Sequence, residues 1–430
     1  MTSSPLLTSG AATEISSVLP AGSRVNRQGH LEVAGCDLVE VAAEFGTPAY
    51  VVDEDDLRRR ARAFLNSLRE RHRDSDVLFA SKAFPSTPVL RVLREEGLAC
   101  DVASGGELTL ALAAGFDPER VFMHGNAKSA AEVGLALEAG VGHVVLDSLD
   151  DLERVARVAS SMSRRQDVLL RVNPDVSGDT HAAISTGQAD SKFGFSAADL
   201  RGAVERIGER SSLRLVGLHC HIGSQLLDLA PFGRAVRALA AIGDYPVYNL
   251  GGGLGVAYLD GQAVPTPEAW VSALVEAAQQ VIGVGKRLLI EPGRALVANS
   301  GLTLYSVETV KRNVSTWVAV DGGMSDNLRP MLYGSRYEAL MADRPRQRAG
   351  ERCHLVGKHC ESGDVMIHGV ELPDPVPGDV IVTPATGAYG YAMANNYNAV
   401  PRPPVVFLSD GGARLVVRRE TYADLMSRDV

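Results

Sequence analysis

The chain has 430 residues, of which 45% are hydrophobic and 22% are charged, a composition typical of folded globular proteins that excludes general disorder. The formal net charge is −9 and no stripe of lysine and arginine stands out, which argues against a nucleic-acid partner. No uncharged apolar stretch reaches the roughly 18 residues that a membrane-spanning helix needs, so no membrane segment is predicted.

The amino-terminal segment, residues 1–20, lacks both the basic start and the apolar core of a secretory signal, and we expect it to be a disordered leader. The chain contains five cysteines, a sparse and odd count that favours a reducing compartment. The sequence therefore predicts a cytoplasmic protein. Residues 21–46 are expected to add one or more strands to a carboxy-terminal β domain.

Residues 47–296 alternate short β-rich runs with helical patterns, at a spacing of about one strand and one helix per 22 residues. This alternation indicates right-handed βαβ units and a parallel sheet. About eight units, without a strong dinucleotide-binding glycine loop, favour a closed (β/α)8 barrel over an open sheet. The predicted strands are 49–53, 77–81, 98–102, 121–124, 143–147, 168–172, 215–219, 247–250 and 288–291.

From residue 297 onward the pattern changes to short alternating segments separated by glycine and proline turns, such as 316–321, 380–383 and 405–408. Alternation of this kind is typical of antiparallel strands. We therefore predict that residues 297–430 form a carboxy-terminal antiparallel β domain, and the fold class is an α/β barrel with an appended β domain.

Side chains at the carboxyl ends of parallel barrel strands converge on one pocket. The residues at the predicted ends are far more polar than a barrel core needs, and buried polar groups are costly without partners. Lys82 follows an apolar run, where desolvation would disfavour its ammonium form and leave a nucleophilic amine; a lysine that only snorkels from the rim is an equally good interpretation. The polar strand-end set is Lys82, Asp101, His124, Asn126, Arg171, His219, His221, Gly251–Gly253 and Glu291–Arg294.

Two strand ends offer groups for an anionic, ring-containing ligand. Gly251, Gly252 and Gly253 let backbone N–H groups approach a phosphate, although a tight turn explains them too. In Glu291-Pro292-Gly293-Arg294, a buried glutamate could hold a protonated pyridine nitrogen and the arginine a phosphate or carboxylate; an ion pair between them is the alternative.

Histidines at 219 and 221, with the Cys353-His354 and His359-Cys360 pairs, offer metal-ligand types. Neither the His219–His221 pair nor the group 353–360 has the spacing of a zinc site, and no carboxylate accompanies either of them. No metal site is therefore predicted. An imidazole stacked on a flat cofactor explains the His219–His221 pair equally well.

Taken together, these motifs resemble the fold-type III pyridoxal-phosphate-dependent decarboxylases, which pair an alanine-racemase-like barrel with a β domain. The segments concerned are 79–83, 219–225, 251–253 and 291–294. Further segments are similar to the diaminopimelate decarboxylases within that family, and the likeness extends over roughly residues 30 to 425. These segments are 180–187, 191–195, 321–334, 359–364 and 386–389.

For the cofactor, pyridoxal 5′-phosphate, the resemblance implies that Lys82 forms the Schiff base. His221 would stack on the ring and Glu291 would pair with the pyridine nitrogen. The other cofactor-binding residues implied are Ser224, Gly251, Gly252, Gly253, Pro292, Gly293, Arg294 and Tyr389.

For the substrate, the resemblance implies meso-2,6-diaminopimelate, converted to L-lysine and carbon dioxide in the last step of lysine biosynthesis. Arg294, Arg329 and Tyr333 would bind a substrate carboxylate. The enzyme must recognise the end of the substrate that does not react, because the two ends of this diamino diacid are alike and only one loses its carboxylate.

The resemblance also implies a homodimer in which Cys360, Glu361 and Tyr389 reach into the neighbouring subunit's pocket. Cys360 would protonate the quinonoid intermediate, while Glu361 and Tyr389 would contact the substrate. A thiol is a plausible acid for that step when its surroundings keep it protonated; an inert buried thiol is the alternative.

Two features depart from the family pattern: Asn249 stands where an aspartate is expected, and the segment 226–246 is several residues short. Three other functions remain open. A decarboxylase acting on arginine, ornithine or carboxynorspermidine would not need Arg329 with Tyr333. A racemase would want tyrosine at position 360, and a non-catalytic, cofactor-binding regulator would have no use for Lys82 and Cys360.

Overall fold

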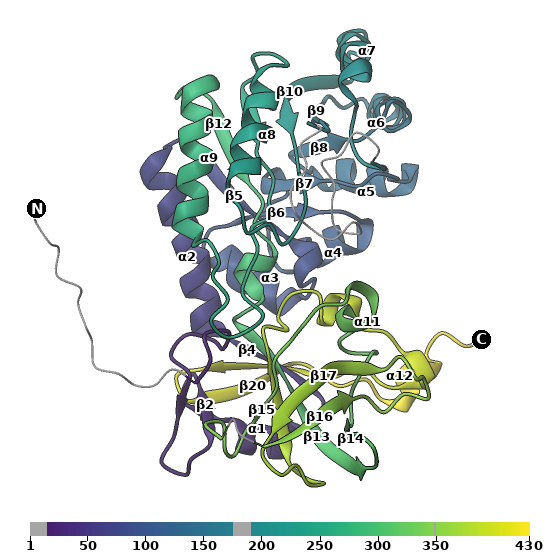
Figure 1. Ribbon diagram of the computed structural model, residues 1–430. Helices are drawn as coiled ribbons and strands as arrows, with labels where there is room; N and C mark the ends of the chain where they lie inside the picture. Colours follow the sequence, from purple (N-terminus) through teal and green to yellow (C-terminus); the bar gives the residue numbers. More distant parts are fainter. Residues whose placement is uncertain (1–14, 175–190, 348–349) are drawn as a thin grey trace, which may run out of the picture.

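The computed structural model describes residues 15–174, 191–347 and 350–430. Figure 1 shows two lobes, one in which helices surround a barrel and one built mainly of β-sheet. The predicted segment 180–187 lies outside the described residues. Among the described helices, none combines the length and the apolar composition needed to cross a membrane.

The first lobe is a closed barrel of eight strands, and every neighbouring pair is parallel. The strands follow one another around the barrel in sequence order, as βα crossovers with one hand require. They are β5 (Ser75–Ala80), β6 (Ala99–Val102), β7 (Val121–Met123), β8 (His143–Leu146), β9 (Gln166–Arg171), β10 (Leu213–His219), β11 (Val247–Asn249) and β12 (Arg287–Ile290).

Helices cover the outside of the barrel (Figure 1), and several of them begin at a side chain that caps a free N–H group. Ser129 and Glu132 form a reciprocal capping box at the start of α5, and Ser104, Ser148 and Thr266 cap α4, α6 and α9. The helices are α2 (Glu54–Arg71), α3 (Thr87–Glu95), α4 (Gly105–Ala113), α5 (Ala130–Ala139), α6 (Leu149–Ser161), α7 (Ala197–Gly208), α8 (Ala230–Ala240) and α9 (Pro267–Val281).

The barrel interior is layered, because side chains on a strand return to the same face every second residue. One layer is apolar and consists of Leu78, Ala99, Phe122, Val145, Leu169, Val247 and Leu289. Two residues further along each of these strands, the inward position is polar in every case except Ala80. This second layer, to which β10 adds His219, consists of Ala80, Asp101, His124, Asp147, Arg171, Asn249 and Glu291, all buried.

The second lobe is a nine-stranded mixed sheet built around the long strand β13 (Gly301–Arg312). The fold class is confirmed, but the predicted antiparallel domain also contains two parallel pairs, β14 with β16 and β19 with β4. The other strands are β4 (Ala49–Asp53), β14 (Thr316–Val320), β15 (Leu340–Met341), β16 (Glu351–Val356), β17 (Val365–Leu372), β18 (Val380–Pro384), β19 (Val405–Ser409) and β20 (Gly412–Val417).

The strand at 49–53 corrects the predicted domain boundary at residue 47. It was expected to open the barrel, but β4 lies in the second sheet between β13 and β19. All five of its residues are buried. A fully buried strand has the same apolar pattern in either sheet, so the pattern alone did not distinguish them. The first barrel strand is β5.

The amino-terminal segment corrects two further expectations. Residues 15–20 are ordered: Val18 is fully buried, and Asn299 donates a hydrogen bond to its carbonyl oxygen (3.2 Å). Only residues 1–14 of the expected leader lie outside the described residues. Residues 21–46 do not extend the large sheet but form a separate three-stranded sheet, β1 (Arg24–Val25), β2 (Leu31–Val33) and β3 (Cys36–Asp37), followed by α1 (Leu38–Phe45). Its apolar side chains pack with those of the second lobe.

Candidate active site

A pocket lies at the carboxyl end of the barrel, directly above the polar layer. It contains nine of the residues predicted above, most of them from strand ends that are far apart in the sequence. The lining residues are Ala80, Lys82, Asp101, His221, Ser224, Gly253, Leu254, Glu291, Gly293, Arg294 and Tyr389. Asn126, also predicted from its strand end, is exposed and does not line this pocket.

Glu291 is the centre of the buried polar network. Asn249 donates from Nδ2 to its Oε1 (2.6 Å), and His219 Nε2 donates to its Oε2 (3.1 Å). His124 Nε2 lies 2.9 Å from Oε1. The predicted alternative, an ion pair between Glu291 and Arg294, is not among the ion pairs of the described residues. Two imidazoles and an amide contact the Glu291 carboxylate instead.

These contacts determine the protonation of the network. Burial alone would raise the pKa of Glu291, but His124 and His219 hold it well below its usual value, so the carboxylate is ionised. Burial lowers the pKa of His219 to about 4, so this imidazole is neutral. Burial would also lower the pKa of His124, but the charges of Asp101 and Glu291 outweigh it and raise that pKa.

The glycine segment after β11 approaches neighbouring backbone too closely for any side chain. A Cβ at Gly252 would meet the Glu291 carbonyl oxygen at 2.1 Å, and one at Gly253, where φ is +117°, would meet that of Gly223 at 2.5 Å. The Gly251 N–H donates to Asn249 Oδ1 (3.0 Å), and the Gly252 N–H donates to His221 Nδ1 (3.2 Å).

Asn249 therefore links two parts of the site. Its amide group donates to Glu291 and accepts from the Gly251 N–H, and the side chain is fully buried. An aspartate here would accept from Gly251 but could donate to Glu291 only when protonated. The departure at this position leaves the glycine segment supported by a side-chain hydrogen bond.

Arg294 begins the short helix α10 (Arg294–Val297) and points its guanidinium into the same region. Its Nη2 donates to Ser224 Oγ (3.0 Å), and its Nη1 donates to the hydroxyl of Tyr258. Ser224, Gly253 and Arg294 thus gather at the pocket, where an oxyanion would meet a hydroxyl and a cation. Pro292 lies beneath, and its carbonyl accepts from the Ala80 N–H (3.4 Å).

Lys82 lies just after β5, and its side chain reaches the pocket. The expected lowering of its pKa is wrong. Burial does lower it, but the surrounding Tyr389, Asp101 and Glu291 outweigh burial and raise the pKa. The apolar run that precedes Lys82 gave no sign of these groups, because they come from other strands and from the second lobe. The amine is therefore held as an ammonium ion by its surroundings.

Tyr389 corrects another expectation, because it lines the pocket of its own chain. Its N–H donates to the Ala83 carbonyl (2.9 Å), and its ring lies 4.8 Å from the guanidinium carbon of Arg294. The second lobe thus closes one side of the barrel's own pocket. Of the three residues expected to serve the neighbouring subunit, only Cys360 and Glu361 remain.

Arg329, at the start of α11 (Arg329–Tyr333), is buried. Its guanidinium carbon lies 4.8 Å from the ring centroid of Tyr258, and its Nη1 donates to the hydroxyl of Tyr337. Tyr333 ends the same short helix and is half-buried. Sequence reasoning missed Tyr258 and Tyr337; the one available signal was an aromatic residue directly after the glycine-rich segment 251–257.

Cys360 and Glu361 are exposed on the turn between β16 and β17, and neither lines the Lys82 pocket. The turn itself is firmly anchored. His359 donates to Asp364 Oδ2 through its backbone N–H (3.0 Å) and contacts it through Nδ1 (2.7 Å), and the Cys360 N–H donates to Asn398 Oδ1 (2.8 Å). The other four cysteines are buried.

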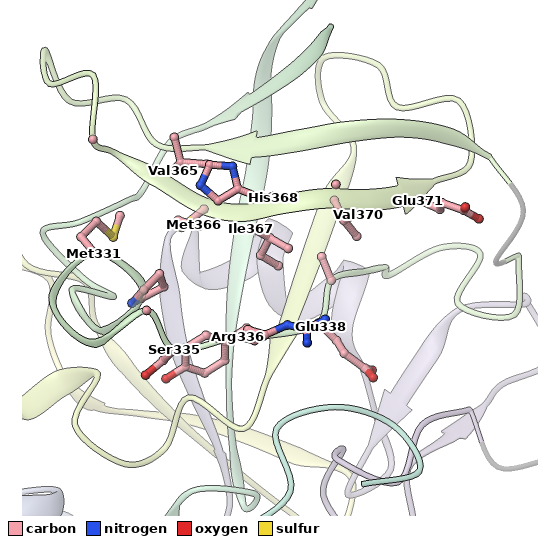
Figure 2. A pocket seen from close by; sticks show the side chains of 16 residues that line it. Met331, Ser335, Arg336, Glu338, Val365, Met366, Ile367, His368, Val370 and Glu371 are labelled. Atoms are coloured by element: carbon pink, nitrogen blue, oxygen red, sulfur yellow. The ribbon is translucent and has the colours of Figure 1, made fainter. Parts of the chain in front are cut away.

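A second, larger hollow of about 570 Å³ lies on the β lobe between the segment 330–339 and β17 with the residues before it, 363–371 (Figure 2). Met366 and Ile367 line it from β17, while Met331, Ser335 and Arg336 line it from the segment 330–339. It is continuous in sequence with the Cys360 turn and with α11. Its residues include no cluster of nucleophilic or acid–base groups comparable to that around Lys82.

The residues around Lys82 fit pyridoxal phosphate. A carboxylate offers about four acceptor positions. Asn249 and His219 use two of those on Glu291, and His124 Nε2 lies 2.9 Å away, so a position remains for a protonated ring nitrogen. Burial holds the pKa of His221 well below its usual value, so its ring is neutral, as stacking on a cationic pyridine ring requires. An amine, a carboxylate and a phosphate-binding group lie around one pocket.

Comparisons with known proteins agree with this geometry. The family model for the pyridoxal-binding domain of pyridoxal-dependent decarboxylases matches residues 54–298. A diaminopimelate decarboxylase from Actinosynnema pretiosum subsp. auranticum is 46% identical, with 100% of this chain and 98% of the relative covered. The enzyme of the same name from Bacillus subtilis strain 168 is 42% identical, with 95% and 97% covered.

Solved structures give the same result. The crystal structure of diaminopimelate decarboxylase from M. jannaschii in complex with L-lysine superimposes with a TM-score of 0.89 at 32% identity, covering 96% of this chain and 98% of that one. Family model, relatives and structure all extend over the barrel, and the relatives and structure extend over the β lobe as well. The chain belongs to the diaminopimelate decarboxylases, a family of pyridoxal-dependent carboxy-lyases.

Proposed function

We propose that the protein decarboxylates meso-2,6-diaminopimelate to L-lysine and carbon dioxide, the last step of lysine biosynthesis, in the cytoplasm. The observation that carries this proposal is the pair of arginines beside the Lys82 pocket. Arg294 and Arg329 contact the same side chain, Tyr258, and neither has a carboxylate partner among the described residues. Two buried cations without a counter-ion favour an anionic ligand, such as the carboxylate at the far end of a diamino diacid.

Pyridoxal phosphate, when bound, supplies the electron sink for the breaking C–CO2 bond. In the proposed mechanism Lys82 Nζ would be the amine that holds the cofactor covalently in this pocket. The ionised Glu291 keeps the ring nitrogen protonated, and Asn249 and His219 hold that carboxylate in place. His221 supports one face of the ring, and Ser224, Arg294 and the glycine segment hold the phosphate.

The last step needs a proton at the carbon that has lost carbon dioxide, and we assign it to Cys360 of a second subunit. No described residue that lines the Lys82 pocket is a cysteine, and Cys360 is the one exposed cysteine of the five. Glu361, beside it, is suited to the substrate's distal ammonium group. The proposed working unit is therefore a homodimer with shared sites.

The test is carbon dioxide release by purified, cofactor-loaded protein offered meso-diaminopimelate, arginine and ornithine in parallel. We expect release from diaminopimelate alone, with L-lysine as the product. Release from arginine or ornithine instead would overturn the role given to the two arginines. Lys82→Ala is the control: it should lose both the covalently attached cofactor and activity, and a retained cofactor chromophore would remove Lys82 from its role.

A further inference from the structure

Tyr258 lies between the two arginines that the proposed function assigns to the cofactor and the substrate. It follows the glycine segment and is 7% exposed. Its hydroxyl accepts a hydrogen bond from Arg294 Nη1. The guanidinium carbon of Arg329 lies 4.8 Å from the centroid of its ring, within the range of a cation–π contact. One side chain thus contacts both cations.

Each arginine has a second contact that holds it from the other side. Arg294 Nη2 donates to Ser224 Oγ (3.0 Å), next to the pocket. Arg329 Nη1 donates to the hydroxyl of Tyr337, whose ring meets Tyr258 edge-on at 5.2 Å and 82°. The order Ser224, Arg294, Tyr258, Arg329, Tyr337 is therefore a continuous chain of contacts that starts at the pocket.

The electrostatics of this chain need Tyr258 in the middle. Arg294 and Arg329 are both buried, and no carboxylate among the described residues forms an ion pair with either, so their positive charges repel each other. The phenol oxygen and the negative face of the ring are the groups between them. Burial on its own would raise the pKa of Tyr258, but the two guanidiniums lower it overall, which agrees with a phenol oxygen that stabilises both cations.

We propose that Tyr258 is a positioning residue that fixes Arg329 relative to Arg294, and so sets the distance between the cofactor end of the site and the group that reads the substrate's second carboxylate. The inference rests on the proposed function and deepens it. A substrate held at Lys82 by one end would meet Arg329 with its other carboxylate only while this spacing is kept. Tyr258 would then act on substrate affinity and specificity rather than on bond breaking.

The test compares Tyr258→Phe with Tyr248→Phe in the cofactor-loaded enzyme. Tyr258→Phe keeps the ring and removes the hydroxyl that Arg294 binds. Tyr248 is a matched control, because it is also a buried tyrosine and its hydroxyl donates to the Gly243 carbonyl (2.6 Å), away from both arginines. Steady-state kinetics with diaminopimelate are combined with inhibition by L-lysine, which keeps the distal carboxylate, and by 1,5-diaminopentane, which lacks it.

For Tyr258→Phe we expect KM for diaminopimelate to rise about 10-fold while kcat stays within about 3-fold. Inhibition by L-lysine should weaken by a similar factor and inhibition by 1,5-diaminopentane should not change. Tyr248→Phe should match the unmodified enzyme in all four values. Tyr337→Phe, which removes a contact to Arg329 alone, should shift KM and L-lysine inhibition in the same direction as Tyr258→Phe, and it serves as the second variant if Tyr258→Phe does not fold.

The proposal is overturned if KM and L-lysine inhibition are unchanged in Tyr258→Phe, or if both inhibitors weaken equally, which would indicate a general loss of packing. Unchanged L-lysine inhibition in Tyr337→Phe would overturn it as well. These outcomes are distinct from failure of the proposed function, in which the unmodified enzyme itself would release no carbon dioxide from diaminopimelate.

Discussion

The barrel pocket and the Cys360 turn differ in how they hold their functional groups. In the pocket, the side chains are buried and each contacts groups from other strands of the same chain, as Glu291 does with His124, His219 and Asn249. On the turn, the buried pair His359 and Asp364 anchors the backbone, but the thiol of Cys360 is exposed.

This difference separates the two parts of the proposed reaction. The groups suited to the cofactor are already arranged within one chain, so a single barrel is expected to bind pyridoxal phosphate. The group assigned to proton donation is firmly anchored but lies outside that pocket. Cofactor binding and turnover should therefore respond differently to changes in the two regions.

The largest effect is expected at the turn. Cys360→Ala removes the proposed proton donor, so turnover should fall by about 10²- to 10⁴-fold. The absorbance of the bound cofactor should stay unchanged, because the pocket does not contain this residue. Cys36→Ala, in the amino-terminal sheet, is the control and should keep full turnover. Full activity in Cys360→Ala would show that another group donates the proton.

The next effect is expected in the pocket. Glu291→Gln replaces the ionised carboxylate that would keep the ring nitrogen protonated, and we expect kcat to fall roughly 10- to 100-fold with weaker cofactor binding. Glu276→Gln, on the exposed face of α9, is the control. Steady-state rates and cofactor titration measure both values. Unchanged kcat in Glu291→Gln would remove the carboxylate from its assigned role.

A smaller effect is expected from Asn249→Asp, which places a second carboxyl group where the amide now lies 2.6 Å from Glu291. Two carboxylates this close cannot both stay ionised, so the pair should hold one proton and cofactor affinity should fall about 10-fold. Because a proton relieves the repulsion, the deficit should shrink as the pH is lowered. Asn249→Ala loses the hydrogen bonds without adding charge, and its deficit should not depend on pH in this way.

The last effect concerns the stability of the β lobe rather than activity. Burial raises the pKa of Asp326, which accepts from the Tyr305 hydroxyl, from 3.8 to about 7. Between about pH 4 and pH 7 the unfolded chain therefore ionises first, and this group lowers the free energy of unfolding as the pH rises, by at most about 4 kcal/mol. Urea unfolding of Asp326→Asn at pH 5 and pH 8 should show a smaller decrease than the unmodified chain. Equal decreases would contradict the raised pKa.

Much of this architecture is predictable from local patterns. The spacing of β-rich runs identified all eight barrel strands, and polar residues at their ends identified most of the pocket. The wrong predictions concern features that depend on contacts between distant parts of the chain. The strand 49–53 has a buried pattern that fits either sheet. Tyr389 lies at the pocket of its own chain, where its backbone N–H donates a hydrogen bond to the Ala83 carbonyl, and no sequence motif indicates this contact.

The pKa of Lys82 could not be predicted from its local sequence for a similar reason. Its local sequence indicates burial, which lowers the pKa, but the groups that raise it come from β6 and from the segment around Tyr389. Tyr258 was missed because its role depends on two arginines that lie 36 and 71 residues further along the chain.

The central claim, that the pocket of one chain needs the turn of another, is tested most directly by mixing two inactive variants. Lys82→Ala and Cys360→Ala are unfolded together in equal amounts, refolded with pyridoxal phosphate and assayed for carbon dioxide release. Random pairing gives mixed dimers with one complete site each, so we predict recovery of about a quarter of the unmodified activity. No recovery, with mixed dimers demonstrated by differential tags, would contradict the shared site.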